Sequence, residues 1–350
     1  MSFTRRQIIM AASAGAAVAT FPAPNVLGQA RKELVLGSLG GTFAANSKKV
    51  FWEPFTAETG IKIIEANYTL AKHKAMVESG QVEWDIGLPA IAQLGELLDI
   101  NAIVPIDYSK VKKSQYSGVA AGEYHVGFQY YSSNIALNTN SFPAGKPAPK
   151  GWADYYDLEV FPGPRSMQRQ PYVALESALL ADGVSPDKLY PLDVDRAFKK
   201  LDQIKSSVSV WWTTGAQAVD VLASGECTMG VAWDSRIAPA KAARQPVDNV
   251  FAGGLLVPSI YTVIKGAPNL DNAFAFLDFM GRADRQAEMA KINYSAPSNL
   301  DAIALIDPAI AKGLCTHPDN LKQLIPLDAL GYWRKNLAPI NERFTAWLSA

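Results

Sequence analysis

Two segments of this 350-residue sequence carry the residue types best suited to holding a small charged molecule. Residues 210–217 and 231–236 each begin with an apolar run that ends in tryptophan, and then continue with small and polar residues. This pattern predicts strands whose carboxyl ends carry Trp212 and Trp233, at the edge where open α/β sheets bind ligands. An indole face attracts an ammonium by about 0.5–2 kcal/mol, and the adjacent carboxylate of Asp234 adds a charge-assisted hydrogen bond. We therefore expect an amine to bind at Trp233 and Asp234.

The same residues have a purely structural interpretation. Tryptophans at strand ends often belong to the core, and Asp234 would then cap a helix over 235–243. We assign Trp211 to the core and favour the ligand for Trp233 and Asp234. Both readings require strands followed by helices.

Composition excludes several classes of function. The 33 basic and 33 acidic side chains offer nucleic acid no basic footprint, and 49% apolar residues exclude disorder. Two cysteines and three histidines lack the spacing of a zinc or redox motif, and no G-x-S-x-G or H-E-x-x-H sequence is present. Catalysis is therefore disfavoured, and no metal is expected.

The glycine turn after the first predicted strand, Gly37-x-x-Gly40-Gly41-Thr42, lacks the dinucleotide fingerprint and the Lys-Ser/Thr pair of a phosphate loop. No cofactor is expected. A tight turn explains the glycines, and so does contact between a solute and the bare amides of a helix start. Both interpretations remain open.

Residues 1–30 have the pattern of an export signal. Arg5 and Arg6 precede an apolar run of about fourteen residues, and small residues end the segment at 28–30. A membrane-spanning helix needs roughly 20 apolar residues, so an anchor is not expected. The paired arginines indicate the twin-arginine route, with the general secretory route as the alternative. We expect an exported protein.

Beyond residue 30, predicted strands and helices alternate. Strands at 33–39, 61–67 and 84–88 enclose helices at 42–59 and 71–79, and such β-α-β units predict a mostly parallel sheet. Residues 141–151 hold three prolines and two glycines and predict a connector. A second set of elements follows it: helices at 193–206 and 215–224, strands at 208–212 and 228–233, and an extended run at 259–264.

Two further features allow alternatives. The pairs Tyr130-Tyr131 and Tyr155-Tyr156 are similar to those of ferric-iron binders, but adjacent strand residues point to opposite faces, which favours a structural role. Cys227 and Cys315 are interpreted as small buried residues, with a disulfide as the weaker alternative.

Many short segments in the same order give the chain a resemblance to the spermidine/putrescine-type solute-binding proteins of bacterial ABC importers. They are Thr42-Phe43 and residues 54–61, 151–154, 161–163, 178–183, 189–195, 224–226 and 265–269. The resemblance implies a periplasmic-binding-protein fold of type II, with two α/β lobes, a hinge and a ligand cleft between the lobes. On this basis we expect residues 31–137 plus about 260–303 to form lobe 1, and 138–259 plus about 304–350 to form lobe 2.

The resemblance also implies a periplasmic location, a permease and ATPase as partners, a monomeric state and no catalysis. Trp233 keeps the family's tryptophan, and Tyr294 matches a pocket tyrosine. The family's polyamine contacts are replaced by residues 90–93 and by Ser259, and Arg169 stands near the place of an acidic residue. The expected ligand contacts are Gly41, Thr42, Gln93, Tyr261 and Tyr294 from lobe 1, and Arg169, Trp212, Trp233, Asp234 and Arg236 from lobe 2.

These replacements bear on the ligand. A polyamine needs a carboxylate near each buried ammonium, because an uncompensated buried charge costs several kcal/mol. Asp234 supplies one, whereas Arg169 or Arg236 would repel a second ammonium and suits a carboxylate instead. We therefore expect a small zwitterion such as 4-aminobutyrate. The alternatives are putrescine or spermidine and, less favoured, a ferric ion at Tyr130 or Tyr131, or hydrolysis by an exported enzyme.

Overall fold

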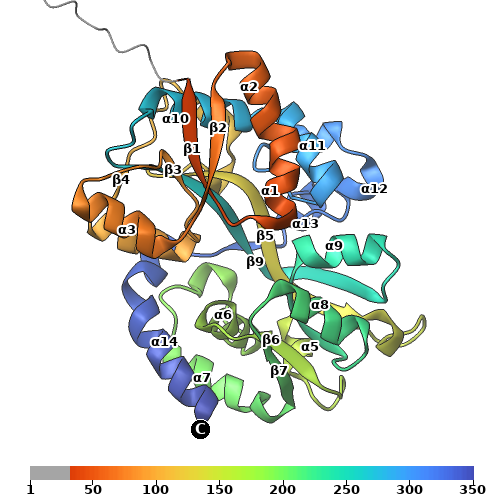
Figure 1. The fold of residues 1–350 in the computed structure, drawn as a ribbon. Helices are drawn as coiled ribbons and strands as arrows, with labels where there is room; N and C mark the ends of the chain where they lie inside the picture. Colours follow the sequence, from red (N-terminus) through yellow and green to blue (C-terminus); the bar gives the residue numbers. More distant parts are fainter. Residues whose placement is uncertain (1–31) are drawn as a thin grey trace, which may run out of the picture. The chain divides into compact units, whose positions relative to one another are not determined.

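The computed structural model describes residues 32–350, which form one compact unit (Figure 1). The predicted export signal, residues 1–30, lies outside the described residues. Within that described part, no helix has both the length and the apolar character required to cross a bilayer.

Strands and helices alternate as the sequence predicts. The strands are β1 Glu33–Ser38, β2 Lys62–Asn67, β3 Ile86–Gly87, β4 Ile103–Val104, β5 Val126–Asn138, β6 Arg165–Gln168, β7 Val208–Trp212, β8 Met229–Trp233, β9 Val247–Ile264 and β10 Ile325–Pro326. The helices are α1 Gly41–Ser47, α2 Glu53–Thr59, α3 Leu70–Ser79, α4 Leu94–Asp99, α5 Trp152–Tyr156, α6 Pro171–Ala181, α7 Val194–Asp202, α8 Gly215–Ala223, α9 Asp234–Ala242, α10 Leu270–Met280, α11 Ala283–Asn293, α12 Pro308–Ala311, α13 Pro318–Leu321 and α14 Arg334–Ser349.

The helix predicted over 42–59 shows how one proline shapes an element. Pro54 lacks an N–H and cannot continue the ladder of an α-helix behind it. The chain accordingly passes through a π-helical turn, Lys48–Trp52, and Pro54 lies in the first turn of α2. Gly60 then ends α2 in the left-handed conformation (φ 72°).

The strands form a mixed sheet in the order β2-β1-β3-β9-β5-β8-β6-β7. The prediction of a mostly parallel sheet holds at its two ends, where β1 pairs in parallel with β2 and β3, and β6 pairs in parallel with β7 and β8. The centre differs, because β5 and β9 are long and antiparallel to each other (Figure 1). The run predicted at 259–264 is only the last third of β9.

Two large apolar cores lie along this sheet. One contains residues of β1, α2, α10 and α11, with Phe55, Phe276 and Phe279 in ring contact, and extends to Cys315. The other contains α6, α7 and α14 and includes Ile325. The central strands β5 and β9 contribute to both cores. Strands shared by two cores are an arrangement in which hinge motion is common.

The cysteines do not pair. Cys227 and Cys315 are both free and buried, and they belong to different hydrophobic clusters. The interpretation of both as small buried residues is confirmed.

Candidate functional site

The parallel strands β6, β7 and β8 bring three large side chains to one edge of the sheet. Gln168, the last residue of β6, pairs in register with Trp212, the last residue of β7. Trp233 ends β8, which pairs with the other side of β6. The carboxyl ends of neighbouring parallel strands meet at one edge, so these residues border a common region.

The two central strands offer this region a small accessible patch. In β5 and in residues 254–264 of β9, every side chain is buried except Gln129, Tyr131 and Ser259, which are half-buried. Gln129 and Tyr131 are two residues apart and therefore share one face of β5. Gln129 pairs with Ser259 and donates a hydrogen bond from Nε2 to its Oγ (3.3 Å). We call these three residues the floor.

Aromatic rings join the floor to the strand edge. The ring of Tyr131 meets that of Trp233 at 5.7 Å, and Trp233 packs perpendicular to Trp212 at 5.3 Å. Trp233 is half-buried, whereas Trp212 has no exposed surface and donates its indole N–H to the carbonyl oxygen of Val231 (2.8 Å). Trp212 therefore supports Trp233 from behind and has no surface for direct contact with a solute.

A third ring, Tyr172, stands beside the floor. It is half-buried at the start of α6, and its ring lies 6.2 Å from that of Trp333. Burial raises the pKa of Tyr131, and the nearby phenol of Tyr172 raises it further. We call the three rings of Tyr131, Tyr172 and Trp233 the aromatic wall; Tyr131 belongs to both the floor and the wall.

Asp234 lies directly behind this wall, at the first residue of α9. It is 2% exposed, and its two carboxylate oxygens accept hydrogen bonds from the backbone N–H of Ser132 (2.7 Å) and of Cys315 (3.1 Å). Burial raises the pKa of Asp234 to about 6, although these donors act in the opposite direction. Among residues 32–350, no lysine, arginine or histidine forms an ion pair with Asp234, so the buried carboxylate has backbone donors but no cationic partner.

Two exposed arginines lie near the same edge. Arg169 follows β6, and its backbone N–H donates to the carbonyl oxygen of Trp212 (2.9 Å). Arg236 and Trp233 both approach Gly215 closely: a Cβ atom there would lie 2.9 Å from the ring of Trp233 and 3.1 Å from Cγ of Arg236. Neither guanidinium forms an ion pair with any carboxylate of the described residues. Both are free to take an anionic group.

The predicted contacts from the first half of the chain have mixed environments. Tyr261 is 3% exposed and packs on Phe128 in the first core (centroids 4.6 Å apart). Tyr294 is half-buried and ends α11 in the left-handed conformation (φ 52°). Gln93 is half-buried, and its side chain accepts a hydrogen bond from the N–H of Ala90 (3.1 Å).

The glycine turn stays accessible. Gly41 and Thr42 are exposed at the start of α1, and Gly40 and Gly41 have φ values of 70° and 68°, which only glycine adopts readily. The turn conformation thus explains the glycine pair without a ligand. The exposure leaves the second interpretation open.

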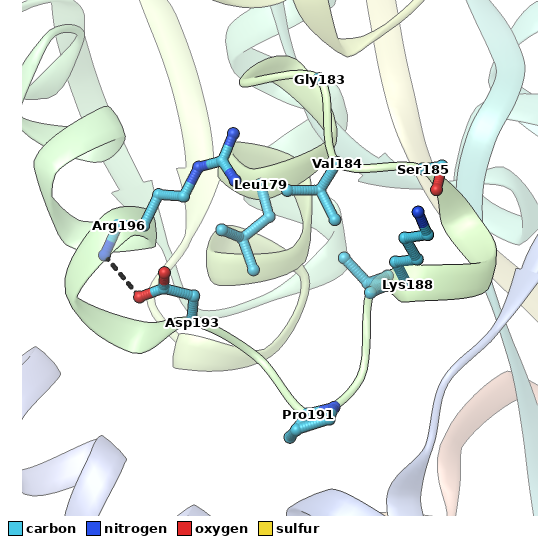
Figure 2. Close-up of a pocket in the computed structure, with 9 residues that line it drawn as sticks. Leu179, Gly183, Val184, Ser185, Lys188, Pro191, Asp193 and Arg196 are labelled. Atoms are coloured by element: carbon cyan, nitrogen blue, oxygen red, sulfur yellow. Dashed lines mark hydrogen bonds between the residues drawn. The ribbon is translucent and has the colours of Figure 1, made fainter.

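Other features of the structure lie apart from this edge. Figure 2 shows a pocket of about 340 Å³ at the far end of α6 from Tyr172, lined by residues that include Leu179, Lys188 and Arg196. The Arg196 guanidinium there already pairs with Asp182 (2.6 Å). The hydroxyl of Tyr130 donates to the carbonyl oxygen of Ser117 and accepts from the N–H of Ala120. In residues 32–350, no group of three His, Cys, Asp or Glu side chains is placed to hold a metal ion.

Comparison with known proteins identifies the family. The family model of the bacterial extracellular solute-binding proteins matches residues 51–313. The chain belongs to this family. The gamma-aminobutyric acid-binding protein of Pseudomonas aeruginosa is 31% identical over 324 residues, which span 90% of this chain and 91% of the relative. The spermidine/putrescine-binding periplasmic protein of Escherichia coli is 24% identical over 282 residues, 76% of this chain and 79% of the relative.

A solved structure of a GABA receptor is 36% identical, with a TM-score of 0.82 over 90% of this chain and 97% of that one. This solute-binding protein therefore has the periplasmic-binding-protein fold, as the sequence predicts. It is the substrate-binding component of an ABC transporter, located in the periplasm, and a binding protein rather than an enzyme. Proteins of this kind deliver small molecules to a permease complex.

Sequence reasoning did not select several residues of the site. The sequence favours a structural role for Tyr131 and does not single out Gln129, Gln168 or Tyr172. Gln129 and Tyr131 could have been found from their positions two residues apart on a predicted strand, which put both side chains on the same face. Tyr172 and Gln168 gave no signal, because their place depends on the turn that leads into α6.

Proposed function

We propose that the solute-binding protein takes up a small zwitterion with a primary amine and a carboxylate, such as 4-aminobutyrate, at the edge formed by Trp233 and the floor. The observation that carries this proposal is the presence, at one edge, of a buried carboxylate without an ion-pair partner, Asp234, and of two guanidinium groups without an ion pair, Arg169 and Arg236. The site therefore combines one negative group with two positive groups, which are the charges that a zwitterion requires.

The ammonium group is assigned to the aromatic wall. Its contacts are the faces of Tyr131, Tyr172 and Trp233, and cation–π attraction is strongest on an indole. The oxygens of Asp234 already accept from backbone N–H groups, so its proposed role is the field of its charge rather than a direct salt bridge. A bound cation would neutralise this charge, whose isolation in the core is unfavourable.

The carboxylate group is assigned to Arg236, with Arg169 as the second candidate. A guanidinium binds a carboxylate through two parallel N–H donors. Arg236 is favoured because its side chain approaches Gly215 from the same neighbourhood as the ring of Trp233. The oxygen Oε1 of Gln168 is buried and has no hydrogen-bond partner among the described residues, which offers a further acceptor to a ligand N–H.

Closure of two lobes is proposed as the binding step. Lobe 1 (31–137 and about 260–303) and lobe 2 (138–259 and about 304–350) would hinge on β5 and β9, which contribute to both cores. Gly41, Thr42, Gln93, Tyr261 and Tyr294 would then meet the ligand from lobe 1, Tyr261 only after its side chain moves out of the core. Ligand contact with both lobes favours the closed form, which a permease and ATPase would recognise on a monomeric protein.

The relatives favour 4-aminobutyrate over a polyamine. The GABA-binding relative covers more of the chain at higher identity than the spermidine/putrescine-binding relatives do. Putrescine remains the alternative ligand, because the wall and Asp234 serve one end of a diamine equally well.

Calorimetry of the purified protein tests the assignment. We expect binding of 4-aminobutyrate, much weaker binding of putrescine, which lacks the carboxylate, and much weaker binding of butyrate, which lacks the amine. Tight binding of putrescine with no response to 4-aminobutyrate would replace the zwitterion with a diamine. A mass spectrum of any small molecule that copurifies gives an independent check.

A further inference from the structure

Glu176, a residue assigned no part in ligand contact above, lies at the centre of a buried network behind Tyr172. Its side chain has no exposed surface. One carboxylate oxygen, Oε2, accepts from the backbone N–H of Val173 (2.7 Å). The other, Oε1, accepts from the hydroxyl of Tyr190 (2.8 Å) and the indole N–H of Trp333 (2.7 Å). One anion thus ties together three separate segments of the chain.

The hydrogen bond to Val173 holds an unusual backbone conformation. Val173 has φ 70° and ψ −44°, although it lies within the first turn of α6. A β-branched residue at positive φ is strained, and such residues persist only where the surrounding structure enforces the conformation. The Glu176 carboxylate supplies that enforcement at the N–H, while the Val173 side chain is 1% exposed in the core.

The same carboxylate fixes both supports of Tyr172. Tyr172 precedes the strained residue, so its backbone direction depends on the Val173 turn. Its ring rests against Trp333, whose indole N–H is held by Glu176. The Glu176 charge also raises the pKa of Tyr172, in addition to the larger effect of burial. The position of Tyr172 in the aromatic wall is therefore set through Glu176.

We propose that Glu176, in its ionised form, is a positioning residue that holds Tyr172 in the aromatic wall and so sets the affinity for the ligand. This inference rests on the proposed amine site for its consequence on binding. Protonation of Glu176 converts one of its carboxylate oxygens from an acceptor into a hydrogen-bond donor. The Val173 N–H, the Tyr190 hydroxyl and the Trp333 indole N–H then compete for the acceptor sites that are left. The Val173 turn loses its restraint, and Tyr172 leaves its binding position.

The surroundings of Glu176 make this proton uptake accessible. The side chains that face the Glu176 carboxylate are those of Tyr172 on α6, of Tyr190, and of Tyr332 and Trp333 on the 329–333 turn. Asp328 takes part only through its backbone N–H, which donates a hydrogen bond to the hydroxyl of Tyr190. None of these is a cation. Burial consequently raises the pKa of Glu176 to about 7, although its hydrogen bonds lower it. Affinity should be highest above pH 7 and should fall as the pH drops through that value.

The test combines two readouts on the whole protein. The first is the NMR resonance of the Trp333 indole N–H, assigned with Trp333→Phe, measured from pH 5 to 9 without ligand. The second is calorimetry with 4-aminobutyrate over the same range. In the wild type we expect the resonance and the affinity to change together near pH 7. In Glu176→Gln we expect a flat resonance near that pH and about tenfold weaker binding at pH 8.5, since one charged acceptor is lost.

Tyr190→Phe is the matched control. It removes one donor to the carboxylate without touching Val173, so the midpoint should move to higher pH while the affinity at pH 9 stays within about twofold of wild type. Wild-type affinity of Glu176→Gln at every pH, or a Trp333 resonance that does not titrate in the wild type, would overturn the inference. The wild-type titration gives this answer even when the variant fails to fold. A titrating resonance with no binding of 4-aminobutyrate or putrescine would instead overturn the proposed ligand class and leave the network intact.

Discussion

Replacement of Asp234 by asparagine removes the charge behind the aromatic wall and keeps the shape of the side chain. The interaction of two unit charges about 5 Å apart, at an effective dielectric constant near 20, is worth about 3 kcal/mol. Loss of that attraction weakens binding by about two orders of magnitude. We therefore expect Asp234→Asn to bind 4-aminobutyrate about 100-fold more weakly at pH 7.5.

The effect of this substitution on the free energy of unfolding should be small. The rise in the Asp234 pKa from 3.8 to about 6 corresponds to about 3 kcal/mol of unfavourable burial, which the neutral amide avoids. In exchange, one backbone N–H, of Ser132 or Cys315, loses its charged acceptor, at a cost of about 1.5–3 kcal/mol. The two terms nearly cancel, so Asp234→Asn should lose affinity for 4-aminobutyrate while its free energy of unfolding stays close to that of the wild type.

Calorimetry with urea unfolding distinguishes these effects, and Asp248→Asn is the matched control. Asp248 pairs with Lys241 at an exposed position (2.7 Å), so its replacement makes the same change in net charge away from the wall. The control should bind like the wild type. Unchanged affinity in Asp234→Asn, or an equal loss in Asp248→Asn, would refute the assignment of the negative charge.

Three further predictions follow from the same contacts. In calorimetry, Arg236→Gln should weaken the binding of 4-aminobutyrate at least tenfold and leave the binding of putrescine unchanged or tighter. The exposed control Arg343→Gln should change the binding of neither ligand. Equal losses of affinity for both ligands in Arg236→Gln would contradict a carboxylate site at this residue. Arg165 has no exposed surface and donates hydrogen bonds to the carbonyl oxygens of Tyr155 (3.3 Å) and Phe161. Arg165→Met should therefore lower the free energy of unfolding, measured in urea, by about 3 kcal/mol. A loss below about 1 kcal/mol would show that those carbonyl oxygens find other donors. Burial raises the pKa values of Glu176 and Asp234 above their unfolded values, so their contribution to stability is complete near pH 4 and is lost as the pH rises through about 6 and 7. Chemical unfolding of the wild type should show this decline in the free energy of unfolding, and in Glu176→Gln the part of the decline near pH 7 should be missing. Identical pH profiles for the two proteins would contradict the prediction.

The sequence predicted most of the local elements because their signals are local. The run before the glycine turn at Gly40 gave β1 closely, the run after Gly60 gave β2, and helical spacing gave the start of α7. The long central strands were underestimated, since β9 runs from Val247 to Ile264 and its half-polar first part has no clear alternation. Their antiparallel pairing joins residues far apart in the chain, which no short pattern encodes.

The candidate site was predicted only in part, for a physical reason. The residue types at Trp233, Asp234 and Arg236 suggested the chemistry, but burial decides which atoms remain available. Trp212 and Trp233 both end an apolar strand and precede polar residues, yet Trp212 is fully buried and Trp233 is half-buried. The exposed face of β5 and the strained turn at Val173 depend on packing against distant segments. These features cannot be derived without the structure.

A crystal structure of the protein with 4-aminobutyrate tests the central claim most directly. We predict the ligand ammonium over the ring of Trp233, beside Tyr131 and Tyr172, and the ligand carboxylate on Arg236 or Arg169. A ligand bound elsewhere, or bound with its carboxylate against Trp233 and its amine toward the arginines, would contradict the account.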